Sequence, residues 1–195
     1  MEKSYRTTRE ILNFATLLYR MRLPEDDEEI VAPNLLDMPS GVTPVIIPLT
    51  SEQDEVTRVV NEIRELFKAG VTRDDILIIH AEWQGVDRLL ERLRHEFGPA
   101  SAADPKDVRK GNHIRVCTLN AATGLESPIV FLCGVHSLYE QEQSIRLSDD
   151  ERAELIRDNT RRLYMAITRA GQRLVLTYVG TLPNALMRIG APMIC

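Results

Sequence analysis

Residues 76–79 read Ile-Leu-Ile-Ile, and residues 129–132 read Ile-Val-Phe-Leu. Each stretch is a continuous apolar run of strand length, without the polar alternation that marks a strand with one face in water. Runs of this kind are typical of strands that are buried on both faces. The two stretches therefore predict a sheet covered by helices on both sides.

Helical patterns alternate with these two runs and with three further predicted strands. The further strands are expected at residues 45–49, 114–118 and 174–177, with Pro48 indicating an edge strand or a strand end. Helices are expected from Ile11 to Arg22, from the Ser51 cap to Gly70, from Val86 to about Gly98 and from Asp150 to Arg169. Apolar strands that alternate with helices indicate an α/β fold with a parallel sheet.

The amino-terminal helix carries a capping signal. Thr7 and Glu10 have the spacing of a capping box, in which each side chain bonds the backbone N–H of the other residue. After Pro24 the chain is rich in proline, and residues 24–43 are predicted to form an irregular connection. The chain of 195 residues is interpreted as one domain over residues 1–195.

The composition excludes several classes of protein. The chain has 24 basic and 29 acidic residues, which gives a formal charge of −5. This charge argues against a broad basic surface for nucleic acid, so any such contact must be local. Three cysteines without a Cys-x-x-Cys pair argue against a disulfide scaffold and a structural zinc site, so no metal site is predicted. No apolar run approaches the roughly 20 residues of a membrane span. We expect a cytoplasmic protein without a membrane partner.

Three segments stand out as candidate ligand sites. They are residues 118–126, a small-residue loop between two buried strands, residues 166–170 at the end of the long helix, and residues 4–6 before the first helix. Ligands of open α/β sheets bind at the carboxyl ends of the strands, and we expect these segments there. Taken singly, an arginine at a helix end is more often a cation that complements the helix dipole.

In this order the three segments resemble motifs IV, V and VI of the UvrD/Rep-like superfamily 1 DNA helicases. The motif IV counterpart starts at Tyr5-Arg6, and residues 118–131, reading TLNAATGLESPIVF, are similar to motif V. Residues 161–170, reading RRLYMAITRA, are similar to motif VI and carry the most specific part of the likeness. The resemblance covers the chain from Tyr5 to about Tyr178.

The resemblance implies a fold and a function. Such helicases bind ATP between two RecA-like domains, and this chain resembles the second, carboxy-terminal one (domain 2A), a parallel sheet covered by helices on both faces. The expected function is the motor domain of an ATP-dependent DNA helicase, which couples ATP hydrolysis to translocation on single-stranded DNA and to unwinding of duplex DNA. ATP with Mg²⁺ is the expected cofactor, and DNA and the first RecA-like domain are the expected partners.

The resemblance also implies roles for single residues. Tyr5 would stack on the adenine, and Arg6 would reach the γ-phosphate. Glu126 would form a hydrogen bond with the ribose, and Gly124 belongs to the same ATP-binding segment. Arg169 would be the arginine finger, a planar and permanently charged group on the transferred phosphoryl group. Arg6 and Arg169 are thus the predicted catalytic residues. Thr118 and Asn120 are the predicted DNA-binding residues.

Some parts of the helicase pattern are missing or altered. The sequence has no G-x-x-x-x-G-K-[ST] phosphate loop, and no strand ends in paired acids for magnesium. We expect these elements on the absent first domain, and the 2B insertion is absent too, because only about fifteen residues connect Gly98 to Asn112. Asn120 and Thr123 stand where the motif V pattern has histidine and lysine, which weakens the expected contact with DNA phosphates.

Three interpretations remain open at this point. The alternative to a helicase motor is a non-catalytic RecA-like module that binds a nucleotide or a protein. An unrelated doubly wound nucleotide-binding enzyme ranks last, because no G-x-G-x-x-G follows a predicted strand. Trp83, the single tryptophan, follows a predicted strand, and a packing role is favoured over stacking on a base.

Overall fold

The computed structural model of the protein describes residues 7–24, 35, 38–106 and 112–189. Within these residues six strands form one sheet in the order β1-β6-β5-β2-β4-β3, and every pair is parallel. The strands are β1 (Val45–Leu49), β2 (Ile76–His80), β3 (Ala102–Ala103), β4 (Ile114–Thr118), β5 (Ser127–Cys133) and β6 (Ala170–Val179). The α-helices are α1 (Arg9–Arg22), α2 (Glu52–Lys68), α3 (Trp83–Phe97), α4 (Val135–Glu142), α5 (Asp149–Ile167) and α6 (Asn184–Arg188).

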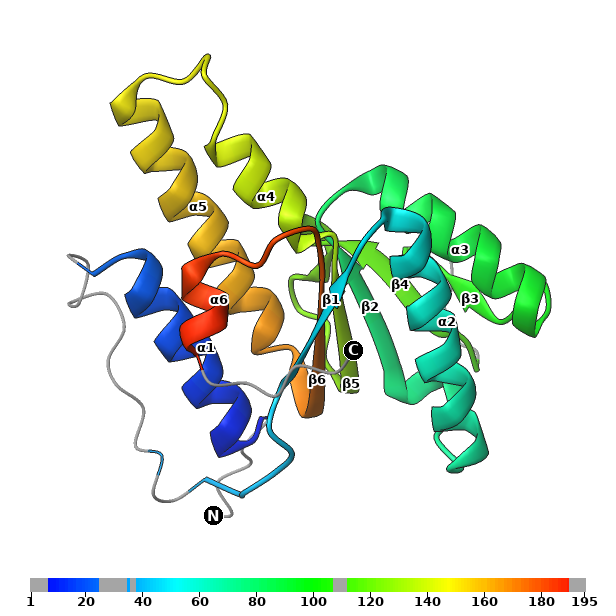
Figure 1. The fold of residues 1–195 in the computed structure, drawn as a ribbon. Coiled ribbons are helices and arrows are strands. Elements are labelled where there is room, and N and C mark those ends of the chain that lie inside the picture. Colours follow the sequence, from blue (N-terminus) through cyan, green and yellow to red (C-terminus); the bar gives the residue numbers. More distant parts are fainter. Residues whose placement is uncertain (1–6, 25–34, 36–37, 107–111, 190–195) are drawn as a thin grey trace.

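The helices cover both faces of the sheet (Figure 1). Helices α2 and α3 pack on one face, and alternate strand residues such as Ile76 and Ile78 point toward them. Helices α1, α4, α5 and α6 pack on the other face, against residues such as Leu77 and Ile79. The α/β fold with a RecA-like parallel sheet is therefore confirmed.

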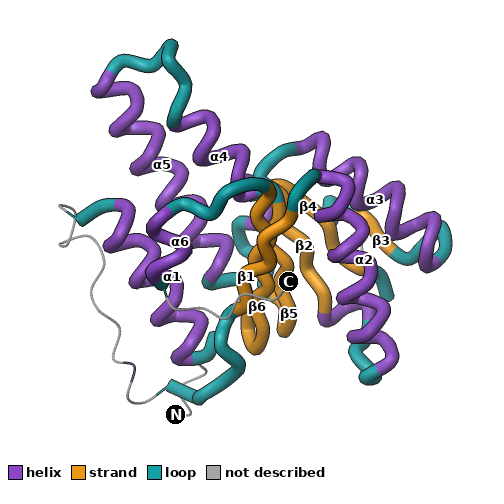
Figure 2. The backbone as a smooth tube through the Cα atoms, in the orientation of Figure 1, coloured by secondary structure: helices purple, strands orange, loops and turns teal. Residues whose placement is uncertain are grey.

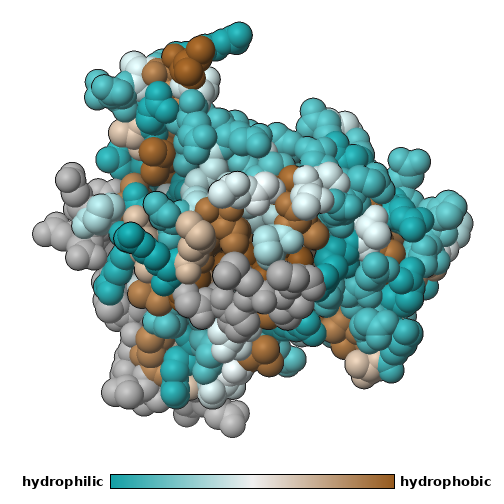
Figure 3. Space-filling view, viewed as in Figure 1, coloured by the Kyte–Doolittle hydropathy of each residue, from teal (hydrophilic) through white to brown (hydrophobic). Residues whose placement is uncertain are grey.

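The buried runs explain why the sheet forms. All five residues of β2 are buried, as are Ile129 to Cys133 in β5. The outer surfaces of α2 and α3 are largely hydrophilic (Figure 3), because each helix turns one apolar stripe to the sheet and leaves its polar side in water. Strand β1 lies at one end of the sheet, which confirms the edge position indicated by Pro48.

The parallel arrangement gives the sheet two distinct edges. We call the edge where strands begin the amino edge, and the edge where they end the carboxyl edge. Residues 119–126 connect the carboxyl end of β4 with the amino end of β5, so this segment runs from one edge to the other. Leu119 and Ala122 are buried in the core on the α1 and α5 side, which holds the segment on that face of the sheet.

Two local predictions were wrong. Helix α1 begins at Arg9 with Thr8 as its N-cap, and the Thr7–Glu10 capping box does not form. The hydroxyl of Thr7 donates to the carbonyl of Ala170 at 2.7 Å, and Glu10 accepts from the Ser40 hydroxyl and the Gly41 N–H. Both side chains have partners distant in sequence that replace the local ones. The bond from Ser40 is the main reason why the pKa of Glu10 lies below its usual value.

Other boundaries differ from the sequence prediction. Helix α5 ends at Ile167, so Arg169 lies just beyond the helix and not at its last residue. Helix α4 and the short strand β3 were not predicted (Figure 2). Of the irregular connection at residues 24–43, residues 25–34 and 36–37 lie outside the described residues.

Candidate nucleotide and DNA sites

Arg169 lies at the amino edge, between the end of α5 and the start of β6. Its Nε donates to the carbonyl of Met165 at 3.0 Å, and its Nη1 donates to the carbonyl of Leu125 at 3.4 Å. The side chain is half-buried. Two backbone acceptors therefore fix a permanently charged group near the surface, in the way expected of a preorganised cation.

The same contacts bring motifs V and VI together. Leu125 lies between Gly124 and Glu126, and the N–H of Ser127 donates to the carbonyl of Arg169 at 3.1 Å. Gly124 and Glu126 are exposed, and Gly124 has a φ of +80°, a conformation that favours glycine. The predicted ATP-binding residues Gly124, Glu126 and Arg169 thus converge at one place on the amino edge.

The motif IV counterpart reaches this place only in part. Tyr5 and Arg6 lie outside the described residues, so their predicted roles have no structural account. The next residue, Thr7, bonds the carbonyl of Ala170, which follows Arg169 directly. Helix α1 packs against α5, with the rings of Tyr19 and Tyr164 in edge contact at 5.9 Å. The chain enters the described region beside Arg169.

The expected location at the carboxyl ends of the strands was wrong for these residues. Glu126 precedes β5 and Arg169 precedes β6, so both lie where strands begin. Each residue lies at the end of a segment that runs back from the carboxyl edge to the amino edge, residues 119–126 for Glu126 and helix α5 for Arg169.

The predicted DNA-binding residues lie at the opposite, carboxyl edge. Thr118 ends β4 beside His80 of β2, and its hydroxyl accepts from the Ala121 N–H at 3.4 Å. Asn120 is exposed, as is Thr123, whose hydroxyl donates to the Asn120 carbonyl. The structure therefore separates the candidate DNA residues from Arg169.

Trp83 is the first residue of α3 at this same carboxyl edge. It is 62% exposed, so the favoured packing role was wrong. An indole left in water at the edge that also carries Thr118 and Asn120 presents a flat apolar face to solvent. Such a face is suited to stacking on a base.

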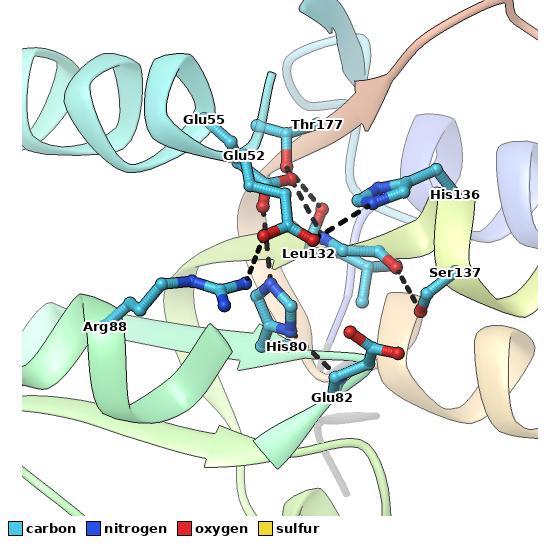
Figure 4. Close-up of polar contacts among 10 residues, drawn as sticks. Glu52, Glu55, His80, Glu82, Arg88, Leu132, His136, Ser137 and Thr177 are labelled. Atoms are coloured by element: carbon cyan, nitrogen blue, oxygen red, sulfur yellow. Dashed lines mark hydrogen bonds and ion pairs between the residues drawn. The ribbon is translucent and has the colours of Figure 1, made fainter. Parts of the chain in front are cut away.

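A buried polar cluster that the sequence analysis missed lies beneath the carboxyl edge (Figure 4). Glu55 of α2 is 1% exposed, and its carboxylate accepts from the Gly134 N–H at 2.9 Å and the Thr177 hydroxyl at 2.6 Å. His80, at the end of β2, lies with its Nε2 3.3 Å from the other carboxylate oxygen. A charged residue among the apolar positions of α2 was the available signal.

Hydrogen bonding decides the charge of Glu55. Burial acts to raise the pKa of this carboxyl, but the bonds from His80, Thr177 and Gly134 together outweigh burial and hold the pKa below its usual value. Glu52 lies nearer the surface, in an ion pair with Arg88 at 2.9 Å. The cluster therefore contains a buried carboxylate that is ionised at neutral pH.

Two cavities in the described region are lined by none of the predicted site residues. A cavity of about 320 Å³ between α2 and α3 is lined by Gln53, Val56, Arg88, Glu91, Arg92 and His95. A second cavity, of about 490 Å³, lies against Tyr139, Tyr178 and the segment after β6. Within the described residues, no group of three side chains could hold a metal ion, and no helix has the length and apolar character to cross a membrane.

Comparisons with known proteins bear on the family and the fold of this chain. A sequence profile described as an AAA domain matches residues 48–180. The chain is 36% identical over 80 residues to the ATP-dependent DNA helicase PcrA of Staphylococcus epidermidis, and 35% identical over 77 residues to PcrA of Staphylococcus aureus. These matches cover 40% and 39% of this chain but only 11% and 10% of the relatives, so the chain matches about a tenth of their length.

A solved structure shows the same fold over nearly the whole chain. It is the carboxy-terminal domain of a possible DNA helicase from Lactobacillus plantarum, with a TM-score of 0.68 and 20% sequence identity, and the match covers 97% of this chain and 98% of that one. The class defined by fold and site is a RecA-like α/β domain. The chain belongs to the AAA domain family, and the matches to PcrA and to the carboxy-terminal helicase domain support its resemblance to the UvrD/Rep-like superfamily 1 helicases.

Proposed function

We propose that this chain is the carboxy-terminal motor domain of an ATP-dependent DNA helicase. The amino edge would complete an ATP site that a first RecA-like domain begins, and the carboxyl edge would contact single-stranded DNA. The observation that carries the proposal is the position of Arg169. It is held by the carbonyls of Met165 and Leu125, next to the exposed Glu126.

The residues at the amino edge fit one side of a nucleotide. A guanidinium suits the charge of a phosphoryl group in transfer, and the carboxylate of Glu126 suits the hydroxyls of a ribose. ATP with Mg²⁺ would supply the phosphoryl group to be hydrolysed. In this proposal Arg169 stabilises the charge that develops on that group, while the first domain holds the phosphates and the magnesium ion.

The carboxyl edge fits a weak contact with single-stranded DNA. Asn120 offers an amide that donates and accepts, Thr118 offers a hydroxyl, and Trp83 offers an exposed indole. We propose that these residues touch the DNA without reading its sequence, since stacking and backbone contacts tolerate every base. The altered residues Asn120 and Thr123 lower the expected number of phosphate contacts, so moderate salt should abolish binding by this chain.

The test compares this chain alone with the chain joined to its first RecA-like domain. With magnesium, ATP and single-stranded DNA, this chain alone should release phosphate at the background rate, because it has no phosphate loop. The joined protein should hydrolyse ATP, and DNA should stimulate it. Clear DNA-stimulated turnover by this chain alone would refute the proposal. A joined protein that binds ATP but never hydrolyses it would favour a non-catalytic nucleotide-binding module.

A further inference from the structure

The ring of His80 occupies a slot built of glycines. A Cβ atom added to Gly85 would lie 2.0 Å from the ring, and one added to Gly134 would lie 2.3 Å from it. His80 is 2% exposed. At positions 85 and 134, any residue larger than glycine would overlap the ring. The backbone of α3 and the backbone before α4 therefore approach the two sides of one imidazole.

Hydrogen bonds of His80 and Glu55 connect four segments, three through the two side chains and one through the backbone of His80. The Glu82 N–H, at the start of α3, donates to His80 Nδ1 at 2.9 Å. The His80 carbonyl accepts from the Leu119 N–H at 3.2 Å, directly after Thr118. Glu55 of α2 accepts from the His80 ring and from the Gly134 N–H, which precedes α4. The two buried side chains thus join the starts of α3 and α4 to helix α2, and the backbone of His80 adds the segment that contains Asn120.

These contacts define the tautomer of His80. Because Nδ1 accepts from the Glu82 N–H, it carries no proton, and the ring proton lies on Nε2. Nε2–H then donates to the Glu55 carboxylate. The ring therefore accepts one hydrogen bond from the start of α3 and donates one to Glu55 of α2.

We propose that His80 is a positioning residue that, supported by Glu55, holds the start of α3 and hence Trp83 in place at the carboxyl edge, the edge where Thr118 and Asn120 also lie. The importance of this position for DNA binding rests on the proposed function. The positioning itself does not, because it concerns only contacts within this chain. If the only need were to fill the space that the His80 ring occupies, an apolar residue would do so without burying the carboxylate of Glu55, whose desolvation is costly. The polar pair supplies directional bonds to named backbone groups.

Two substitutions separate the two bonds of the ring. In His80→Asn the amide oxygen can take the place of Nδ1 and accept from Glu82, while the reach to Glu55 is lost. In His80→Gln the amide nitrogen can take the place of Nε2 and donate to Glu55, while the acceptor for Glu82 is lost. If the ring positions α3, the glutamine variant should release the start of the helix and the asparagine variant should retain it.

Trp83 reports the result directly, because it is the only tryptophan in the chain. Time-resolved fluorescence anisotropy of the 195-residue chain should show the same local motion in wild type and His80→Asn, and a larger fast component in His80→Gln. Hydrogen exchange at the Glu82 amide should be about tenfold faster in His80→Gln than in His80→Asn, as expected for one lost hydrogen bond. Equal Trp83 motion and equal exchange in the two variants would overturn the proposal.

A control at the other end of α3 accounts for general loss of stability. Ser101 is fully buried, and its hydroxyl donates to the Leu93 carbonyl at 3.0 Å. Ser101→Ala should lower the thermal midpoint without changing Trp83 motion. If neither His80 variant folds, the wild-type protein still decides. A protected Glu82 amide and an Nε2–H tautomer in a nitrogen-15 spectrum support the proposal, and an exposed amide or a protonated Nδ1 refutes it.

A DNA arm separates this inference from the proposed function. Binding of a fluorescein-labelled oligothymidylate at low salt should weaken in His80→Gln by a factor close to that of Trp83→Ala, and should change little in His80→Asn. If wild type fails to bind at all, the DNA role of the carboxyl edge is wrong, while the Trp83 motion still decides the role of His80. If Trp83→Ala weakens binding and His80→Gln does not, the positioning is refuted and the DNA role stands.

Discussion

The two edges of the sheet are built in different ways. At the amino edge, Arg169 is a half-buried cation fixed by two backbone carbonyls, near the exposed Gly124 and Glu126. At the carboxyl edge, the exposed Trp83 and Asn120 lie over a buried ionised cluster. The first edge is suited to one strong charged contact, and the second to several weak contacts that depend on backbone position.

One segment connects the two edges. Residues 119–126 begin beside His80 at the carboxyl edge and end beside Arg169 at the amino edge, with Leu119 and Ala122 anchored in the core. A displacement at one end of this short, anchored segment has a direct covalent route to the other end. Gly124 and Glu126 of the candidate nucleotide site therefore lie at the opposite edge from Thr118 and Asn120, although all four residues are close along the chain.

The largest effect is expected at the amino edge. In the protein joined to its first RecA-like domain, Arg169→Ala should lower ATP turnover by about 10³–10⁵-fold, the range for a lost arginine finger. Arg169→Lys should not restore turnover, because a point charge cannot replace the planar guanidinium. Phosphate release is the measurement, and the helix content of each variant is the control. Turnover above about a tenth of wild type would make Arg169 an ordinary cation at a helix end.

The next effect concerns stability at the carboxyl edge. Glu55→Gln should lower the free energy of unfolding by about 3 kcal/mol at neutral pH, because bonds to a buried charged acceptor are lost. Bonds from His80, Thr177 and Gly134 hold the pKa of Glu55 below its usual value despite burial, so its contribution is fully present above the unfolded-state pKa and is lost as the pH falls through the folded-state pKa.

Urea denaturation of wild type and Glu55→Gln at neutral pH and near pH 3 measures this dependence. The difference in stability between the two proteins should shrink at the lower pH, because protonation of Glu55 removes its contribution in wild type. The other carboxyls titrate alike in both proteins and cancel from the difference. A difference that stays constant would mean that Glu55 is not ionised in the folded protein.

A smaller effect is expected from crowding the His80 slot. Gly85→Ala should destabilise the fold by about 1–3 kcal/mol, the usual cost of overpacking, because its Cβ would overlap the ring. In a His80→Ala background the same glycine change should cost much less, and a thermal double-mutant cycle measures that coupling. Additive effects of the two substitutions would show that α3 can shift away from the ring without cost.

The sequence predicted the sheet and most helices because apolar runs and helical spacing are local signals. It could not predict α4, where Val135 to Tyr139 are all buried and no amphipathic pattern exists. The capping box at Thr7 failed because tertiary partners took both side chains. Boundaries such as the end of α5 depend on packing and are not encoded in a short window.

The candidate site was predictable only as a set of motifs. The likeness of residues 118–126 and 161–170 to motifs V and VI marked Glu126 and Arg169, and their place at the amino edge follows from their positions directly before β5 and β6 in a parallel sheet. The Glu55–His80 pair joins residues that are 25 positions apart. The charged Glu55 among the apolar positions of α2 was a signal, but no local pattern identifies His80 as its partner. Trp83 was assigned to packing because exposure cannot be read from one residue type.

The most direct test of the separation of the two edges uses ATP hydrolysis as a function of DNA concentration, in the protein joined to its first RecA-like domain. Arg169→Ala should lower the maximal turnover, measured by single-turnover phosphate release, and leave the affinity for labelled single-stranded DNA unchanged. Trp83→Ala should raise the DNA concentration for half-maximal stimulation by about fivefold or more, as for a lost base stack, and leave turnover at saturating DNA unchanged. If both substitutions changed the same parameter, or if Trp83→Ala left DNA stimulation as in wild type, the assignment of nucleotide and DNA to opposite edges would be contradicted.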